Sequence, residues 1–151
     1  KHTDYAVVVL IRLSEAACEP MQTSPGIAIA TGVPEPTVAK VLKALSAANL
    51  VASQRGARGG YRLRQPLDRV TIADVIAAID GPIALTACVE GSAGCCDVQN
   101  MCAVKGRWDV VNDAIRAALG AITLADMRIA SVPLAFRLPL QPPAASAAAA
   151  E

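Results

Sequence analysis

Residues 32–64 read GVPEPTVAKVLKALSAANLVASQRGARGGYRLR, and the spacing of their apolar side chains changes halfway along. The first half has the i, i+3, i+4, i+7 spacing of a helix that buries one face, carried by Val38, Val41, Leu42 and Leu45. This spacing predicts a helix over 35–48. In the second half, residues 50–53 and 61–64 are typical of two short strands, and three glycines in the joining loop permit a tight reversal.

Further helices are predicted on both sides of this stretch. A helix over 4–17 has apolar residues at helical spacing. A short helix over 25–31 has Ser24 as its expected N-cap, and a helix over 71–80 has Thr71 as its expected cap. Helix, short helix, glycine turn, helix and ribbon is the order of a winged helix-turn-helix. We therefore expect a mainly α fold with a two-stranded wing.

The distribution of charge supports a nucleic-acid partner. The formal net charge is only +1, and charged residues make up 18% of the chain, which excludes a highly charged disordered protein. However, residues 40–69 hold seven basic residues and one acidic residue, a balance of +6, between two acidic segments. A basic block of this kind is the electrostatic footprint that DNA binding requires, although it is also compatible with a solvated basic surface.

The outward face of the 35–48 helix and the predicted wing supply the candidate DNA-binding residues. These are Glu35, Thr37, Lys40, Lys43, Arg55, Arg58, Tyr61 and Arg62. Thr37 and Lys40 lie near the helix start, which approaches base edges in such motifs, whereas Lys43 is expected to meet a phosphate. The loop arginines suit an adjacent minor groove. Tyr61 could stack on DNA, but packing under the wing is the favoured interpretation.

Four of the five cysteines fall within fifteen residues, in a predicted loop over 82–102. They are Cys88, Cys95, Cys96 and Cys102. Their thiolates suit an iron–sulfur cluster, zinc or copper(I), and reactive or simply buried thiols remain an alternative. A zinc site usually has short cysteine pairs, which are absent here. No histidine base lies near the loop, so a thiol enzyme is not expected. Cys18 is interpreted as a small core residue.

The last part of the chain predicts a dimerisation helix and a tail. Within residues 103–130, a helix over 103–127 has a heptad-like seam, formed by Val104, Trp108, Val111, Ile115, Ala118, Ile122 and Ala125. The seam favours pairing with a second copy over packing on the chain's own core. Residues 131–151 are rich in proline and alanine and are expected to be disordered. No stretch approaches the roughly 20 apolar residues of a membrane span, and without an export signal a cytoplasmic location is expected.

At this point the residues resemble a known family. Gly32-Val33-Pro34 through Leu50-Val51, then Arg55-Gly56 and Gly59-Gly60-Tyr61-Arg62-Leu63, are similar to the bacterial winged-helix iron–sulfur regulators. That family includes the Isc-type and Suf-type cluster-assembly regulators and the nitric-oxide-sensing repressors. The resemblance, over about residues 3–127, implies a homodimeric transcription factor that acts on a pseudo-palindromic site in double-stranded DNA. It also implies a 2Fe-2S or 4Fe-4S cluster, with control of cluster-assembly genes as the expected role.

Two departures from the family pattern affect the expected cluster ligands. The family spaces its three cysteines by five residues, whereas this chain has a longer first gap and a doubled middle cysteine, so Cys95 and Cys96 compete for one place. Isc-type members have a histidine where this chain has Lys105. Thr3-Asp4-Tyr5-Ala6 resembles the start of the nitric-oxide-sensing members. This resemblance implies Asp4, reaching the cluster from the partner subunit, as the fourth ligand; a helix-start carboxylate is the alternative. The rival functions are a nitric-oxide or redox sensor of the same fold, and a zinc-binding or thiol redox protein that does not act on DNA.

Overall fold

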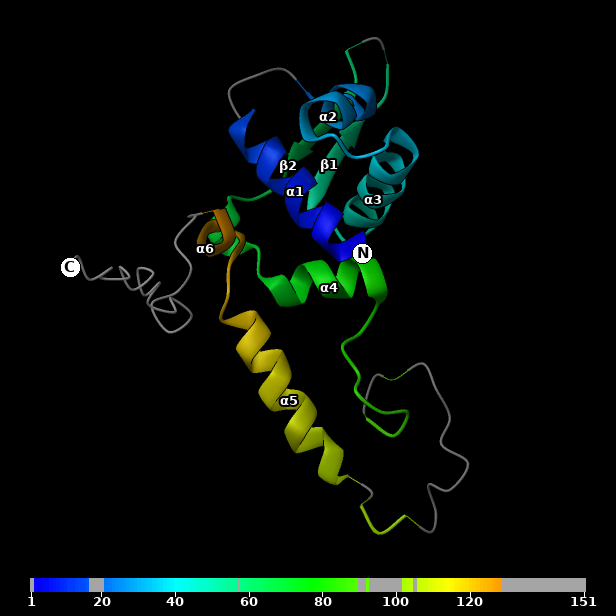
Figure 1. Ribbon diagram of the computed structural model, residues 1–151, viewed down its shortest axis with the longest axis vertical. Coiled ribbons are helices and arrows are strands. Elements are labelled where there is room, and N and C mark those ends of the chain that lie inside the picture. Colours follow the sequence, from blue (N-terminus) through cyan, green and yellow to red (C-terminus); the bar gives the residue numbers. More distant parts are fainter. Residues whose placement is uncertain are drawn as a thin grey trace, which may run out of the picture.

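The computed structural model describes residues 2–16, 21–56, 58–89, 92, 102–104 and 106–128. Its elements are α1 (His2–Glu15), α2 (Ser24–Thr31), α3 (Glu35–Ala47), β1 (Val51–Gln54), β2 (Gly60–Leu63), η1 (Leu67–Arg69), α4 (Ile72–Asp80), α5 (Arg107–Gly120) and α6 (Leu124–Arg128). Helices α1 to α3 and the ribbon form one body, and α5 extends away from it beyond α4 (Figure 1). The mainly helical, winged helix-turn-helix fold is therefore confirmed.

The hydrophobic core lies between α1 and α3, and the other elements pack around this contact. The predicted stripe of α3 is at most 1% exposed, and it consists of Val38, Val41, Leu42 and Leu45. Fully burying one such side chain stabilises a fold by about 1.5–3 kcal/mol. Helix α1 adds the fully buried Ala6, Val9 and Leu10, and α4 adds Val75. This packing holds α3 with its polar face outward.

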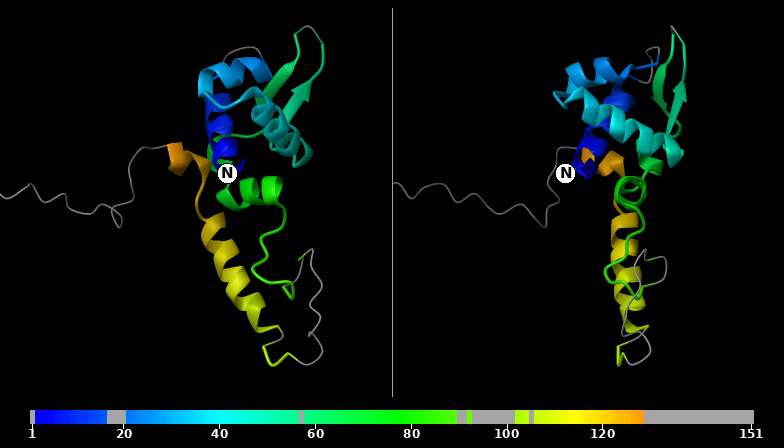
Figure 2. Two further views of the ribbon diagram at one scale, coloured as in Figure 1. Left: turned by 45° about the vertical axis from the view of Figure 1, so that its right-hand side comes forward. Right: turned by 90° about the vertical axis from the view of Figure 1, so that its right-hand side faces the viewer.

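The wing is an antiparallel pair in which Val51 faces Leu63 and Gln54 faces Gly60. The chain just before α2 joins it, because Gln22 and Tyr61 exchange two backbone hydrogen bonds of 3.0 and 2.8 Å. The ribbon extends past the helices in two further views (Figure 2). Its base is therefore fixed to the helical body while its loop is presented outward.

The helix caps follow the sequence with one correction. Thr71 caps α4 in a capping box with Asp74, as the sequence predicts for Thr71. Ser24 does not cap α2; Thr23 does, because its Oγ1 accepts the N–H of Gly26 at 3.2 Å. Ser24 instead lies in the first turn, and its hydroxyl is buried. Both residues are good caps, and Pro25 is acceptable at either of the first two helix positions, which is why the sequence did not separate them.

The prediction of one continuous helix over 103–127 is wrong. Helix α5 begins at Arg107 and ends at Gly120, and α6 begins separately at Leu124. Thr123 caps α6 through its hydroxyl and Asp126, and the hydrogen bonds from Thr123 lower the pKa of the Asp126 carboxyl. The break also places Leu124, fully buried, against the core.

Several sequence predictions lie outside the described residues. They concern Cys18, Cys95, Cys96, Lys105 and the tail over 131–151. Over the residues that the structure does describe, no helix has both the length and the apolar character needed to cross a membrane.

Candidate nucleic-acid interface

The outward strip of α3 lies between two occupied flanks. On one flank, Ser46 contacts Ser53 of β1 at 3.4 Å between the hydroxyl oxygens. On the other flank, Lys40 and Ala44 line a small cavity of about 160 Å³ with His2 of α1 and Asp80 of α4. Lys43 lies on the open strip between these flanks, and Lys40 lies at the edge of that strip, where it also borders the cavity; the two lysines are three residues apart and both are exposed. This surface has the shape and charge that a major groove accepts.

The start of α3 carries the other predicted helix contacts. Glu35 lies exposed in the first turn, and Thr37 is half-buried one turn before Lys40. Pro34 provides no side-chain cap, but its carbonyl oxygen accepts the N–H groups of Thr37 and Val38 at 2.9 and 3.0 Å. The structure therefore places Glu35, Thr37 and Lys40 together at the N-terminal end of α3, where base contacts are expected.

The wing residues divide into exposed cations and an inward tyrosine. Arg55 and Arg58 are exposed in the loop between the strands, and Arg62 is exposed on β2. Tyr61 is half-buried and packs against the core, in agreement with the packing interpretation. The three arginines thus extend the basic surface of α3 onto the ribbon.

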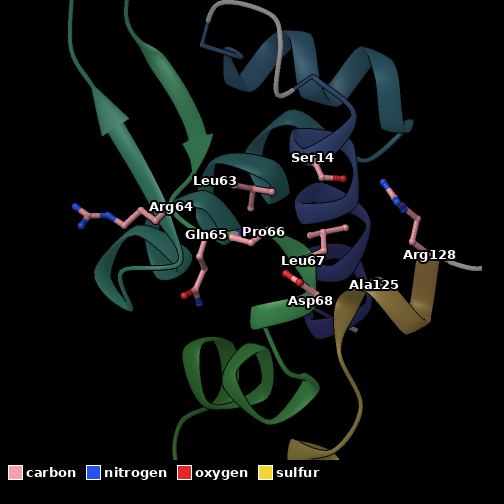
Figure 3. Close-up of a pocket in the computed structure, with 9 residues that line it drawn as sticks. All are labelled: Ser14, Leu63, Arg64, Gln65, Pro66, Leu67, Asp68, Ala125 and Arg128. Atoms are coloured by element: carbon pink, nitrogen blue, oxygen red, sulfur yellow. The ribbon is translucent and has the colours of Figure 1, made fainter.

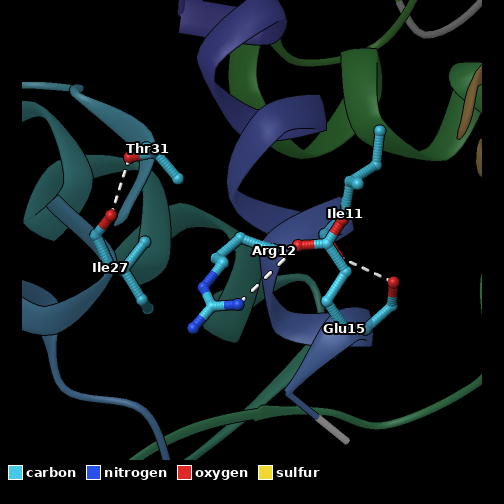
Figure 4. A network of polar contacts seen from close by, with 6 residues as sticks. Ile11, Arg12, Glu15, Ile27 and Thr31 are labelled. Carbon is cyan, nitrogen blue, oxygen red and sulfur yellow. Dashed lines mark hydrogen bonds and ion pairs between the residues drawn. The ribbon is translucent and has the colours of Figure 1, made fainter. Parts of the chain in front are cut away.

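Among the residues that the structure describes, no carboxylate of the same chain forms an ion pair with the cations of this surface. An ion pair elsewhere in the described part of the chain joins Arg12 to Glu15 at 3.7 Å, within α1. Figure 4 shows this pair beside the hydrogen bond from the Thr31 hydroxyl to the Ile27 carbonyl oxygen of α2, 2.7 Å long. Arg12 is engaged locally, whereas Lys40, Lys43 and the wing arginines remain available to neutralise phosphates.

Replacing Gly60 by alanine is expected to loosen the wing. A Cβ at Gly60 would lie 2.7 Å from the carbonyl oxygen of Gln22, a backbone atom that cannot move without breaking the Gln22–Tyr61 bridge. We expect a loss of about 1–3 kcal/mol in the free energy of unfolding by urea, together with weaker DNA binding. Gly120→Ala is the matched control, because nothing lies within 4 Å of its Cβ position. Equal free energies of unfolding for Gly60→Ala and Gly120→Ala would contradict the predicted clash at Gly60.

A second hollow among the described residues does not belong to this interface. It measures about 540 Å³ and lies between α1, η1, the end of β2 and α6 (Figure 3). Its charged lining residues are Arg64, Asp68 and Arg128, and all three are exposed. It therefore presents no desolvated charge that would recognise a small ligand, and we assign it to the packing of this junction.

Three of the predicted cluster ligands are described: Asp4 and two half-buried free thiols, those of Cys88 and Cys102. Cys88 lies in the segment after α4, where the Thr86 hydroxyl is 3.2 Å from its Sγ, and Cys102 lies just before α5. Asp4 is exposed in the first turn of α1, and its neighbour Thr3 donates a hydrogen bond to Asp80 at the end of α4. Within the described residues, no three His, Cys, Asp or Glu side chains are grouped closely enough to hold a metal ion.

Sequence reasoning passes over one residue near these thiols. Asn112 of α5 is 1% exposed and hydrogen-bonds the segment that leads to Cys88. An asparagine in an amphipathic helix resembles any surface residue, and its partners lie 27 and 29 residues earlier. Its position directly after the predicted seam residue Val111 is the only signal in the sequence.

Comparisons with known proteins agree with this geometry. The profile of the Rrf2 family, described as an iron-dependent transcriptional regulator, matches residues 1–128. Protein aau3 of Rhizobium meliloti is 32% identical over 95% of this chain and 92% of its own length. The structure of CymR, the global cysteine regulator of B. subtilis, superposes with a TM-score of 0.61 at 27% identity, over 84% of this chain and 92% of that chain. The structure of T. potens IscR superposes with a TM-score of 0.58 at 28% identity, over 84% and 82% of the two chains.

Proposed function

Because the chain belongs to the Rrf2 family of winged-helix transcriptional regulators, we propose that it is a homodimeric repressor whose DNA binding responds to an iron–sulfur cluster. DNA-binding regulation is the activity of the family, and the related proteins are regulators rather than enzymes. The genes of cluster assembly are the proposed targets. The observation that carries the proposal is the pairing of an unneutralised basic helix and wing with half-buried thiols near the start of α5.

The thiols described fit an iron–sulfur cluster chemically. Cys88 and Cys102 are not in disulfides, and thiolate sulfur is the usual ligand of such clusters. With Cys95 or Cys96 as the third thiolate and Asp4, of the partner subunit, as the fourth ligand, the set would be complete. A bound cluster would supply a group sensitive to redox state. The protein's own part is to hold these thiolates where their loop meets the DNA-binding body, so that gain or loss of ligands shifts the population of two states.

Anaerobic purification is expected to give a coloured protein that contains iron and acid-labile sulfide. Cys88→Ala or Cys102→Ala should abolish the visible absorption, because each removes a proposed ligand, whereas Cys18→Ala should retain it. The measurement is a visible spectrum with iron and sulfide counts for all three variants. A colourless wild-type protein with stoichiometric zinc would rule out the cluster.

A second copy of the chain is the proposed partner. On α5 and in the residues beside it, Trp108 is 38% exposed, Val111 44%, Val104 45% and Ile122 41%. These side chains belong to the predicted seam and are called here the apolar strip, and exposed apolar groups gathered along one helix favour an interaction surface. Pairing through this strip would place two α3 helices on one DNA site, which requires a pseudo-palindromic sequence.

The similarity to CymR favours a second candidate, a regulator of cysteine metabolism that responds without a cluster. The two are separated by iron content and by comparing operator affinity of the cluster-loaded and cluster-free protein. Equal affinities in a protein that binds no iron would favour the second. If the cluster is present, nitric oxide added to the loaded protein tests the nitric-oxide-sensing alternative through operator release.

A further inference from the structure

Asn112 is a buried polar residue on a helix whose surface is otherwise largely exposed. It is 1% exposed. Its Nδ2 donates to the carbonyl oxygen of Ile83 at 2.9 Å, and its Oδ1 accepts the N–H of Leu85 at 3.1 Å. One side-chain amide therefore satisfies a backbone acceptor and a backbone donor of the same segment. Leaving a buried polar group without its hydrogen-bond partner costs free energy. These two hydrogen bonds therefore oppose separation of the segment from α5.

The segment held by Asn112 is the one that carries Cys88. Residues 81–89 run from the end of α4 alongside α5 (Figures 1 and 2). Other hydrogen bonds of residues 83–89 in the described part of the chain are local: one joins Thr86 and Cys88, one runs from the Val89 N–H to the Thr86 carbonyl oxygen, and one runs from the Ser92 N–H to the Val89 carbonyl oxygen. Asn112 thus supplies the hydrogen bonds that fix the segment to α5, three residues before Cys88.

The far end of α5 is joined to the DNA-binding body in a similar way. The Ile72 N–H donates to the Ile122 carbonyl oxygen and the Leu124 N–H to the Val70 carbonyl oxygen, both at 2.9 Å. These two bonds hold the residues after α5 against the start of α4. The residues after α5 are thus hydrogen-bonded to the chain at the start of α4, and Asn112 of α5 is hydrogen-bonded to the segment that follows α4.

We propose that Asn112 is a positioning residue that sets where Cys88 lies relative to α5, and that it transmits movement of the cysteine segment to that helix. The second part rests on the proposed function, since it takes Cys88 as a ligand of the sensing site. The first part depends on the protein's own contacts alone. Asn112 binds backbone groups and touches no ligand, so its effect on Cys88 is indirect.

The test is the alkylation of Cys88 in the reduced, metal-free full chain. In Asn112→Leu, both hydrogen bonds are removed while a strong helix former of similar size keeps α5 intact. We expect N-ethylmaleimide to label Cys88 about tenfold faster relative to Cys102, which corresponds to about 1.4 kcal/mol in the opening equilibrium. Peptide mass spectrometry at fixed pH measures both rates. Asp113→Asn, which changes an exposed neighbour on the same helix and keeps both hydrogen bonds of Asn112, should leave the ratio unchanged.

Hydrogen exchange provides a second measurement on the same variants. The Leu85 N–H donates to Asn112, so exchange in residues 82–89 should accelerate in Asn112→Leu while exchange in α3 stays as in the wild type. Unchanged labelling and exchange in a folded variant would overturn the proposal. So would an equal rise at Cys88 and Cys102 with loss of helical circular dichroism, because that result assigns Asn112 to general stability. Asn112→Ala, which removes both hydrogen bonds without adding bulk or charge, repeats the test if the leucine variant does not fold.

The transmission step has its own readout. If the wild-type protein binds operator DNA with different affinities in its cluster-loaded and cluster-free forms, Asn112→Leu should bring the two affinities within about twofold of each other. An unchanged ratio would overturn transmission while leaving the positioning role in place. A wild-type protein that takes up no cluster would contradict the proposed function, and the labelling experiment would still decide the positioning role.

Discussion

Lys40→Ala combined with Lys43→Ala is expected to lower operator affinity about 100-fold or more. Both lysines lie on the open strip of α3 and neither is paired with a carboxylate of the described chain. A phosphate or base contact is worth about 1–3 kcal/mol, and each protomer of a dimer would lose two. Because the side chains are exposed, the fold should be unaffected, and circular dichroism checks this. Gel shifts over a range of salt concentrations measure the affinity.

The salt dependence separates the roles of the two lysines. If Lys43 meets a phosphate, Lys43→Ala alone should reduce the slope of log affinity against log salt by about one unit for each phosphate that the protein no longer neutralises, hence about two units for a dimer. Lys40→Ala should change the slope less and relax sequence preference more. Arg116→Ala with Arg128→Ala is the control, since it removes the same charge outside α3 and the wing. Equal reductions in affinity in the two double variants would contradict the assignment of α3 as the DNA-binding surface.

The parts of the fold that could be predicted are those that depend on local sequence patterns. The buried stripe of α3 repeats every three or four residues, so Val38 through Leu45 indicate one face of a helix. Glycines in residues 55–60 mark the turn of the wing. Thr71 with Asp74 is a capping box, which the sequence displays at fixed spacing. In each case the interacting residues are near neighbours in the chain.

The errors came from places where two local signals compete or where the partner is distant. The seam spacing continues through Ile122 and Ala125 and so concealed the end of α5, although Thr123 and Asp126 form a second capping box. At this break Thr71 and Thr123 form an isolated bridge, and Leu124 beside it is fully buried, so the end of α5 coincides with tertiary contacts. The role of Asn112 likewise depends on Ile83 and Leu85, which no periodicity connects to α5.

The candidate site was predictable in part for the same reason. The basic strip and wing follow from helical and strand periodicity, so Lys40, Lys43, Arg55, Arg58 and Arg62 are exposed where the pattern puts them. The cluster ligands stay a prediction. Their convergence depends on the path of a long loop and on an aspartate at the other end of the chain, and neither is encoded in spacing.

If α5 pairs with a second copy as proposed, Trp108→Glu is expected to make the protein monomeric at micromolar concentration. Trp108 is 38% exposed in the protomer and lies on the apolar strip with Val111. At a dimer interface its ring would be buried, and large aromatic side chains carry a disproportionate share of interface energy. A carboxylate in its place would be desolvated without a partner, which is strongly unfavourable. We expect the dimer dissociation constant to rise at least about 100-fold, as measured by sedimentation equilibrium.

The matched control is Val110→Glu, on the same helix but off the seam, where the side chain is 74% exposed. It should remain dimeric, because a carboxylate there stays in water. Operator binding should fall with dimerisation in Trp108→Glu alone, since one protomer presents only one α3 to half of the DNA site and the two halves no longer bind as a unit. A dimeric Trp108→Glu beside a monomeric Val110→Glu would move the interface to another face of α5. If both remain dimeric and bind DNA normally, pairing does not use α5, and the strip must be covered by another surface of the molecule.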